Sequence, residues 1–202
     1  WWYRHEFDGL LDGLLYGSLA GFGFAMTENV FYFTTYFNQD ANLGWHLVFL
    51  RSLVFGLNHA LYCSCLGLGL AVARFAKRPA VRLLAPTLGL ALGVALHMFH
   101  NYSVMTHETW APALISNWSG VAVWLLLVGL ALPLDTRCMR QELREGMQAG
   151  LISQRDWRTV TRHRKRVVTK LAAMHQASAE VWNYYFSLLA ELAFKKRQHR
   201  IH

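Results

Sequence analysis

The chain has 202 residues, of which 54% are hydrophobic and only 16% are charged. This balance is more apolar and less charged than that of an ordinary soluble domain. The formal net charge of +8 lies entirely from Asp135 onward, because the residues before it hold six acidic and six basic side chains. An apolar body followed by a basic tail indicates a membrane domain with a cytoplasmic appendage.

Four segments are apolar over about 20 residues, the length that crosses a bilayer. They run at about 10–36, 45–75, 83–105 and 111–134. We therefore predict an all-α fold, a polytopic membrane helix bundle. Residues 1–134 would form its transmembrane domain of four spans, and residues 135–202 a helical, basic tail.

Basic residues set the predicted orientation. Four of them crowd the connection between the second and third spans, and fourteen follow the fourth span. These two ends share a side if all four segments cross, and Lys and Arg are enriched on the cytoplasmic side. The sequence therefore predicts a multi-pass integral membrane protein with a cytoplasmic C-terminal tail. The four residues of the connection are Arg74, Lys77, Arg78 and Arg82.

The tail is expected to form short helices. One is predicted at 137–149, capped by Asp135 and stopped by Gly150, and Ser153 is the expected N-cap of the next. An aromatic helix is predicted at 177–194. The basic run at 162–166 favours anionic lipid headgroups beside a membrane domain. We expect no nucleic-acid partner, since a basic stripe alone is weak support for one.

Three cysteines, Cys63, Cys65 and Cys138, do not imply a disulfide framework. The start at Trp1 has no Met and no signal peptide pattern. Its aromatic cluster is typical of the edge of a membrane helix, and we expect further residues upstream of it.

Glycines mark one face of the first span. Gly13, Gly17 and Gly21 step by four and Glu28 lies seven residues beyond Gly21. At about 100° per residue these positions share a face. Small residues let another helix come close, and a carboxylate is costly in lipid. We therefore expect Glu28 to point into the bundle.

The third span repeats this pattern, because Gly89, Gly93, His97 and Asn101 also step by four. Scattered polar residues facing lipid would be costly, so we expect a shared interior or a water-filled cavity. The catalytic candidates are Glu28, His59, His97 and Asn101, with Asn29, Arg51 and His100 in support, and Asn58 is a further polar residue of these spans. The alternative for Glu28 is a structural ion pair with Arg51 or a histidine.

Such a set could support hydrolysis. A carboxylate can act as general base on a water, His can move a proton near pH 7, and an Asn amide can stabilise an oxyanion. The same groups could instead hold a metal, with Glu28, His59 and His97 as a carboxylate–His₂ set suited to zinc. The sequence has no His-Glu-x-x-His motif, so zinc depends on this set alone.

Three ordered motifs resemble the PrsW family of intramembrane proteases, related to the CAAX prenyl endopeptidases. Phe24-x-x-x-Glu28-Asn29 is similar to the second signature of that family. Arg51 followed by His59-Ala60-Leu61 matches its next helix, and His97-x-x-x-Asn101 its His-x-x-x-Asp/Asn signature. The resemblance implies a membrane peptidase that cleaves membrane-associated proteins by water attack on a peptide bond. By matching motif, Glu28, His97 and Asn101 would be active-site residues, with His59 as a fourth.

One signature of that family is not in this sequence. It is a Glu-Glu-x-x-Lys/Arg motif whose glutamate is the expected water-activating base, and we expect it upstream of Trp1. Two alternative functions remain. One is a catalytically inactive membrane scaffold, and the other is a transporter whose polar cavity conducts protons or ions.

Overall fold

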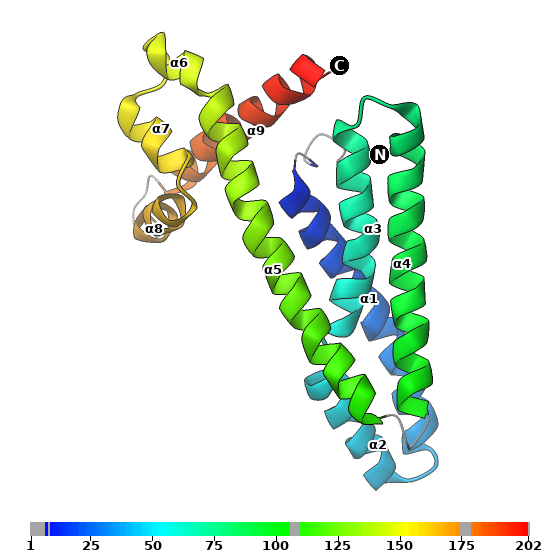
Figure 1. Cartoon of the computed structure of the whole chain (residues 1–202). Helices are drawn as coiled ribbons and strands as arrows, with labels where there is room; N and C mark the ends of the chain where they lie inside the picture. The colour runs from blue at the N-terminus through cyan, green and yellow to red at the C-terminus, as the bar shows by residue number, and fades with distance from the viewer. Residues whose placement is uncertain (1–6, 8, 106–109, 174–178, 202) are drawn as a thin grey trace. The chain divides into compact units, whose positions relative to one another are not determined.

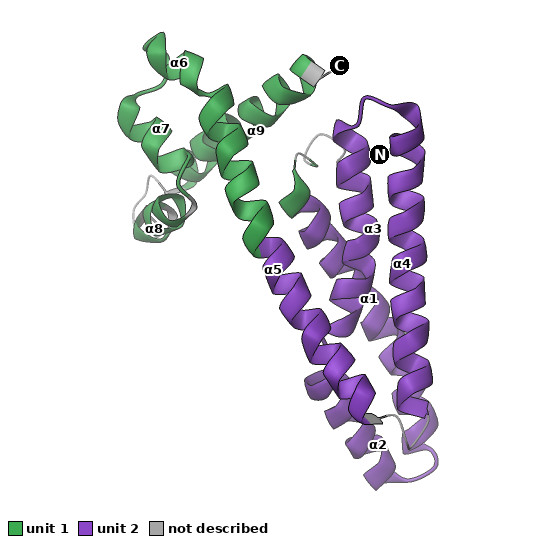
Figure 2. Cartoon of the chain, viewed as in Figure 1, with its two compact units in different colours: residues 1–11, 129–202 green, residues 12–128 purple. Residues whose placement is uncertain are grey.

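The computed structural model describes residue 7 and the ranges 9–105, 110–173 and 179–201. These residues form helices and their connections, and none of the described ones lies in a strand. They belong to two compact units (Figure 2). We call residues 12–128 the bundle unit, and residues 1–11 with 129–202 the tail unit. The predicted all-α fold is confirmed.

The helices that are long and apolar enough to cross a membrane lie wholly or mostly in the bundle unit, and the last of them, α5, continues into the tail unit (Figure 1). Three of them qualify singly, and a fourth crossing is formed if the bent pair of α2/η1 and α3 counts as one span. A polytopic helical membrane protein is therefore confirmed. The elements are α1 (Leu10–Phe37), α2 (Ala41–Phe49), the π-helix η1 (Leu50–Val54), α3 (Asn58–Phe75), α4 (Pro79–Met105) and α5 (Trp110–Glu142).

The second predicted span is interrupted, where the sequence led us to expect one segment at 45–75. Helices α2 and η1 are bent by 44° from α3. Gly56 lies in the break, where an added Cβ would collide with the Ser52 carbonyl. Asn117 Nδ2 of α5 donates a 2.8 Å hydrogen bond to the Val54 carbonyl. A backbone group freed by the break thereby gains a partner, which the membrane interior requires.

Glycine contacts hold the bundle unit together. Cβ atoms added at Gly13, Gly17 and Gly21 of α1 would each collide with the backbone of α3. Helix α4 is the second neighbour of α3, and Cβ atoms added at its Gly89 and Gly93 would also collide with the α3 backbone. Backbones this close gain dispersion contacts that lipid cannot replace. Helix α3 thus packs tightly against both α1 and α4 (Figure 1).

Helix α4 is polar inside and apolar outside. Its buried residues in the described structure are Gly93, His100 and Ser103, whereas Leu88 and Met98 are 64% and 66% exposed. A soluble helix buries its large apolar side chains. This inverse pattern suits a helix whose outer face meets lipid, where small and polar residues form the helix contacts.

A hydroxyl pair joins three helices of the bundle. Ser18 Oγ of α1 lies 3.0 Å from Ser64 Oγ of α3. Trp124 Nε1 of α5 donates to both oxygens, at 3.1 and 3.2 Å. Ser18 and Ser64 are both buried, so these bonds satisfy polar atoms that lipid could not solvate.

The tail unit differs from its prediction at its first helix. Helix α5 continues to Glu142, so Asp135 lies inside a helix and does not cap one. Pro133 marks the end of the apolar span, but the helix continues through it, as membrane helices tolerate a proline whose freed backbone groups find other partners. Gly150 has a φ of 75°, as a helix stop at this position requires. The helices that follow α5 are α6 (Arg144–Gln148), α7 (Gln154–Val160), α8 (His163–Ala173) and α9 (Ala179–Ile201).

Two other tail predictions concern α7 and α9. Ser153 caps α7 as predicted, because its Oγ accepts from the Asp156 amide at 3.0 Å. The expected helix at 177–194 corresponds to α9, although its predicted start at Ala177 lies outside the described residues.

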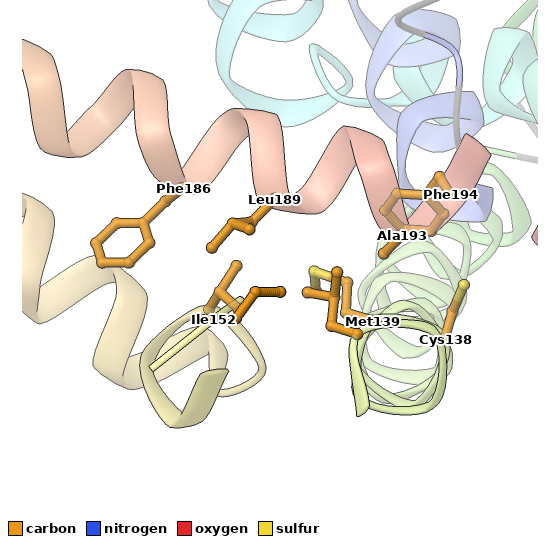
Figure 3. Packing of buried hydrophobic residues seen from close by; sticks show 9 residues of the cluster. Cys138, Met139, Ile152, Phe186, Leu189, Ala193 and Phe194 are labelled. Atoms are coloured by element: carbon orange, nitrogen blue, oxygen red, sulfur yellow. The ribbon is translucent and has the colours of Figure 1, made fainter. Parts of the chain in front are cut away.

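The core of the tail unit forms where α9 meets the end of α5 and the segment before α7. Figure 3 shows Phe186, Leu189 and Ala193 on the face of α9 that is turned toward Ile152 and Met139. Arg200 of α9 pairs with Glu142 at 2.8 Å. Lys196 pairs with Glu145 at 2.9 Å, and this hydrogen bond holds the pKa of Glu145 below its ordinary value. The tail unit therefore has an apolar core of its own.

We expect Gly17→Ala to destabilise the bundle unit. The added Cβ would lie 2.7 Å from the carbonyl oxygen of Cys63 and from the Cα of Ser64, which are backbone atoms. Overpacking of this kind typically costs about 1–3 kcal/mol. A lower Tm of the purified protein in detergent micelles, followed by circular dichroism, would report the loss.

Gly23→Ala on the same helix is the matched control. Apart from the adjoining backbone of α1 and the two neighbouring residues, no described atom lies within 4 Å of its added Cβ, and alanine favours a helix over glycine by roughly 0.5–1 kcal/mol. Its Tm should stay equal or rise slightly. The close contact between α1 and α3 is contradicted if both variants lose the same stability.

Candidate active site

The carboxylate of Glu28 is the centre of a polar group inside the bundle unit. Its Oε2 atom is paired with Arg51 and lies 3.2 Å from His59 Nε2. Its Oε1 atom lies 3.5 Å from His97 Nε2. Each partner comes from a different element: Arg51 from η1, His59 from α3 and His97 from α4. The acid predicted to face the bundle interior thus meets an arginine and two imidazoles there.

The glycine contacts explain why these side chains meet. Gly21 packs on the backbone of His59, and Glu28 follows two turns later on the same face of α1. Gly93 packs on the backbone of Tyr62, and His97 follows one turn later on α4. Both helices therefore approach α3 just before they present their functional side chain.

Arg51 is held by three side chains of α1. It pairs with Glu28, and its Nε donates to Asn29 Oδ1 at 2.6 Å. Its guanidinium carbon lies 4.1 Å above the ring centre of Tyr32. This planar cation is thereby oriented on the Glu28 carboxylate, as the structural alternative for this pair anticipated. The π-helical turn that carries Arg51 directs it toward α1 just before the break in the span.

Most of the charge in this group is removed from solvent. The side chains of Arg51, Glu28 and His97 are 16%, 17% and 22% exposed. Interactions between charges are stronger in such surroundings than at an open surface. The cost of an unpaired carboxylate rises for the same reason.

His59 Nε2 is the atom that points to a metal. It is buried, lies 3.2 Å from a carboxylate oxygen, and yet forms no hydrogen bond to any described residue. A buried polar atom without such a bond is costly and needs a partner. One ligand atom each from Glu28, His59 and His97 can be chosen so that all lie within 4.8 Å of one another. One carboxylate and two imidazoles form a set that zinc accepts, so the residues fit a metal.

Asn101 extends the group along α4. Its Nδ2 lies 3.3 Å from His97 Nε2, the same ring nitrogen that faces Glu28. That nitrogen can accept from the amide or, when protonated, donate to the carboxylate. The four-residue spacing predicted from sequence therefore brings an amide to the edge of the site.

His100 lies beside this group and bonds elsewhere. Its Nδ1 is 3.2 Å from Asn58 Nδ2, and its ring packs on Phe55 at 4.9 Å between centroids. The structure thus unites Glu28, Asn29, Arg51, His59, His97 and Asn101, and places His100 with Asn58 in a neighbouring pair.

Aromatic rings surround the imidazoles, and sequence reasoning gave them no role: it named Phe24 only as part of a motif and did not name Tyr62. Tyr62 stacks on His97 with 5.6 Å between ring centroids, and Phe24 contacts both His59 and His97 at 5.5 and 5.6 Å. Helical spacing could have found both residues. Tyr62 lies three residues after His59 and Phe24 four before Glu28, so each shares a face with a site residue.

Helices long enough to span a bilayer around an enclosed acid and two imidazoles define a polytopic membrane protein with an internal polar site. The sequence model of the PrsW family, described as PrsW family intramembrane metalloprotease, matches residues 1–132. This chain belongs to that family, as the three motifs predicted. It is therefore an integral membrane protein of an intramembrane protease family. The comparisons with curated proteins and with solved structures gave no match.

We expect Arg51→Ala to destabilise the protein by about 3 kcal/mol, because it leaves the enclosed Glu28 carboxylate without its arginine and with only the two imidazoles beside it. Adding Glu28→Gln should restore much of this loss, since the unpaired charge is then gone. Unfolding of the two single variants and the double variant in mixed micelles measures this coupling.

Arg82→Ala is the control for loss of a basic side chain. Arg82 is exposed on α4, and a surface change of this kind stays within about 0.5 kcal/mol. Additive losses from Arg51→Ala and Glu28→Gln would show that the pair does not neutralise a buried charge.

Proposed function

We propose that this protein is a zinc-dependent intramembrane protease whose metal is held by Glu28, His59 and His97. The observation that carries the proposal is the buried His59 Nε2, which has no hydrogen bond within the described structure and lies beside a carboxylate and a second imidazole. Zinc ligands of this type leave a position open for water or substrate. Membership of a metalloprotease family supports the same assignment.

A zinc ion bound by these residues would polarise a peptide carbonyl and lower the pKa of a bound water. The residues of the chain have separate tasks. Arg51 balances the charge of Glu28 and fixes its orientation through Asn29 and Tyr32. Asn101 orients His97 or donates its amide N–H to a developing oxyanion. His100 with Asn58 supports the neighbouring α3–α4 contact.

The water-activating base is not assigned to a residue of this sequence. The resemblance gives that role to a Glu-Glu-x-x-Lys/Arg motif, which the sequence does not contain. Glu28 is already engaged by Arg51 and by two imidazoles. We therefore assign Glu28 to metal binding, with proton transfer as its alternative role.

The substrate class follows from the position of the site. Glu28 and His97 lie within helices long and apolar enough to cross a membrane, and His59 lies within a bent pair that passes the same test as one span. A peptide bond can reach them only from a membrane-associated protein. We propose residues 1–134 as the transmembrane domain and residues 135–202 as its cytoplasmic tail.

Loss of one ligand should remove metal and cleavage together. We expect His59→Ala, His97→Ala and Glu28→Gln each to weaken zinc binding by at least about 100-fold. Mutation of a residue that only hydrogen-bonds to a metal ligand costs up to about 100-fold in affinity, and loss of the ligand itself should cost no less. Competition with a chelating dye in micelles measures the affinity. Sequencing of protein N-termini in membranes of expressing cells measures cleavage, and new N-termini made by the wild type should vanish.

His46→Ala is the matched control, because His46 is exposed on α2 and is not one of the three proposed ligands. It should keep both zinc and cleavage. A scaffold would instead retain partner binding in all variants and produce no new N-termini in any. A transporter would show altered proton or ion flux in Glu28→Gln without any cleavage to lose.

We also propose that the tail meets anionic lipid headgroups. A pocket of about 540 Å³ lies between α7 and α8 in the tail unit. Its basic lining residues are Arg155 and Arg158 of α7 and Arg164 and Lys165 of α8. All four are exposed, and juxtamembrane Lys and Arg each contribute about 1 kcal/mol near an anionic surface.

Changing these four residues to glutamine should lower the share of anionic lipid that remains bound. Mass spectrometry of the protein purified from equal mixtures of phosphatidylglycerol and phosphatidylcholine measures that share. The double variant Arg140→Gln/Arg144→Gln removes exposed charge outside the pocket and should change it less. If the fourfold variant retains the same share of anionic lipid, the pocket does not bind anionic headgroups.

A further inference from the structure

An apolar pocket of about 240 Å³ adjoins the proposed metal ligands within the bundle unit. His59 and His97 are part of its wall. The rest of the lining comes from the facing surfaces of α1, α3 and α4. It includes Phe24, Tyr62, Cys63, Leu66, Leu90 and Val94.

The size and chemistry of this pocket restrict what can occupy it. Pockets for drug-sized ligands measure roughly 300–1,000 Å³, so this one suits a group of the size of an amino-acid side chain. Apart from the two imidazoles, its wall offers aliphatic, aromatic and sulfur surface. A charged group would lose its hydration there without gaining a partner of opposite charge.

The position of the pocket connects it to the reaction. A peptide carbonyl placed at the proposed metal ligands lies beside the rings of His59 and His97. The side chain next to that carbonyl is attached only two bonds from the carbonyl carbon. Because the same two rings line the pocket, this side chain is the part of a substrate that can enter it.

We propose that this pocket binds an aliphatic or aromatic side chain of the substrate, at the residue next to the scissile bond. The inference rests on the proposed proteolytic function and specifies it. The enzyme would then select membrane segments that carry such a residue where the chain is cut. In hydrophobic pockets one methylene changes the selectivity by roughly 10–200-fold.

Cys63 and Val94 are the residues through which this pocket can be tested. Both line it, and Cys63 is a free thiol. Gly93 also lines it, but an added Cβ there would collide with the Tyr62 carbonyl and separate α3 from α4. Val94→Phe fills the pocket from a side chain that is 49% exposed, and Val123→Phe on α5 changes a valine of equal exposure outside it.

The experiment measures how fast methyl methanethiosulfonate labels Cys63 in the full chain, purified in micelles. Cys65→Ser and Cys138→Ala make Cys63 the single thiol. The probes are the N-acetyl N-methylamides of leucine, phenylalanine, aspartate and lysine, together with octanamide as a stand-in for a lipid chain. Labelling after unfolding in SDS gives the full extent, and mass spectrometry detects the product.

We expect the leucine and phenylalanine probes to slow labelling about tenfold at ten times their dissociation constant, by mass action. The aspartate and lysine probes should leave the rate unchanged. Val94→Phe should slow labelling by itself and abolish protection, whereas Val123→Phe should behave like the parent.

Four results would overturn the proposal. The first is a Cys63 that reacts in SDS but never in the folded protein. The second is equal protection by charged and apolar probes, and the third is protection that survives in Val94→Phe. The fourth is stronger protection by octanamide than by the amino-acid probes, which would assign the pocket to a lipid chain.

The pocket and the proposed function can fail separately. Protection of Cys63 is measured without added metal and without cleavage. A protein that binds no zinc but protects Cys63 as expected would refute the metal assignment alone. Zinc binding without selective protection would refute the pocket alone.

Discussion

The close approach of α1 and α4 to α3 is the constraint on which the rest of this structure depends. Glycines at four-residue spacing on both outer helices leave no room for a Cβ against the α3 backbone. In a bilayer there is no hydrophobic gain from bringing apolar helices together, so contact must come from packing and polar bonds. The glycines allow the close packing, and the hydrogen bonds among Ser18, Ser64 and Trp124 are the polar bonds.

That packing also solves the problem of placing charge inside an apolar body. Glu28, Arg51 and two histidines would each be costly alone, but together they exchange ion pairs and nitrogen–oxygen contacts in a small enclosed volume. The break after η1 belongs to the same arrangement. It places Arg51 beside α1, and Asn117 satisfies a carbonyl at the break. Irregular backbone at this depth is tolerated because it is enclosed by protein.

Membership of the PrsW family connects this geometry to intramembrane proteolysis. The family match ends at residue 132, before the tail unit forms its own core from α5, α7 and α9. The polar site and the core of the tail unit therefore lie in different parts of the chain. The basic pocket of the tail and the apolar pocket beside the imidazoles suit ligands of opposite character, a headgroup and a buried side chain.

The sequence by itself determined the all-α membrane fold, the glycine faces and the identity of the polar residues, because composition and helical spacing are local properties. It left open which of those residues meet. Only the tertiary structure brought His59 and His97 to the two oxygens of Glu28 and set His100 apart with Asn58. It also broke the second span and extended the fourth into the tail. Periodicity gives each helix a face but neither its neighbours nor its hydrogen-bond register, and these depend on contacts between segments distant in the sequence.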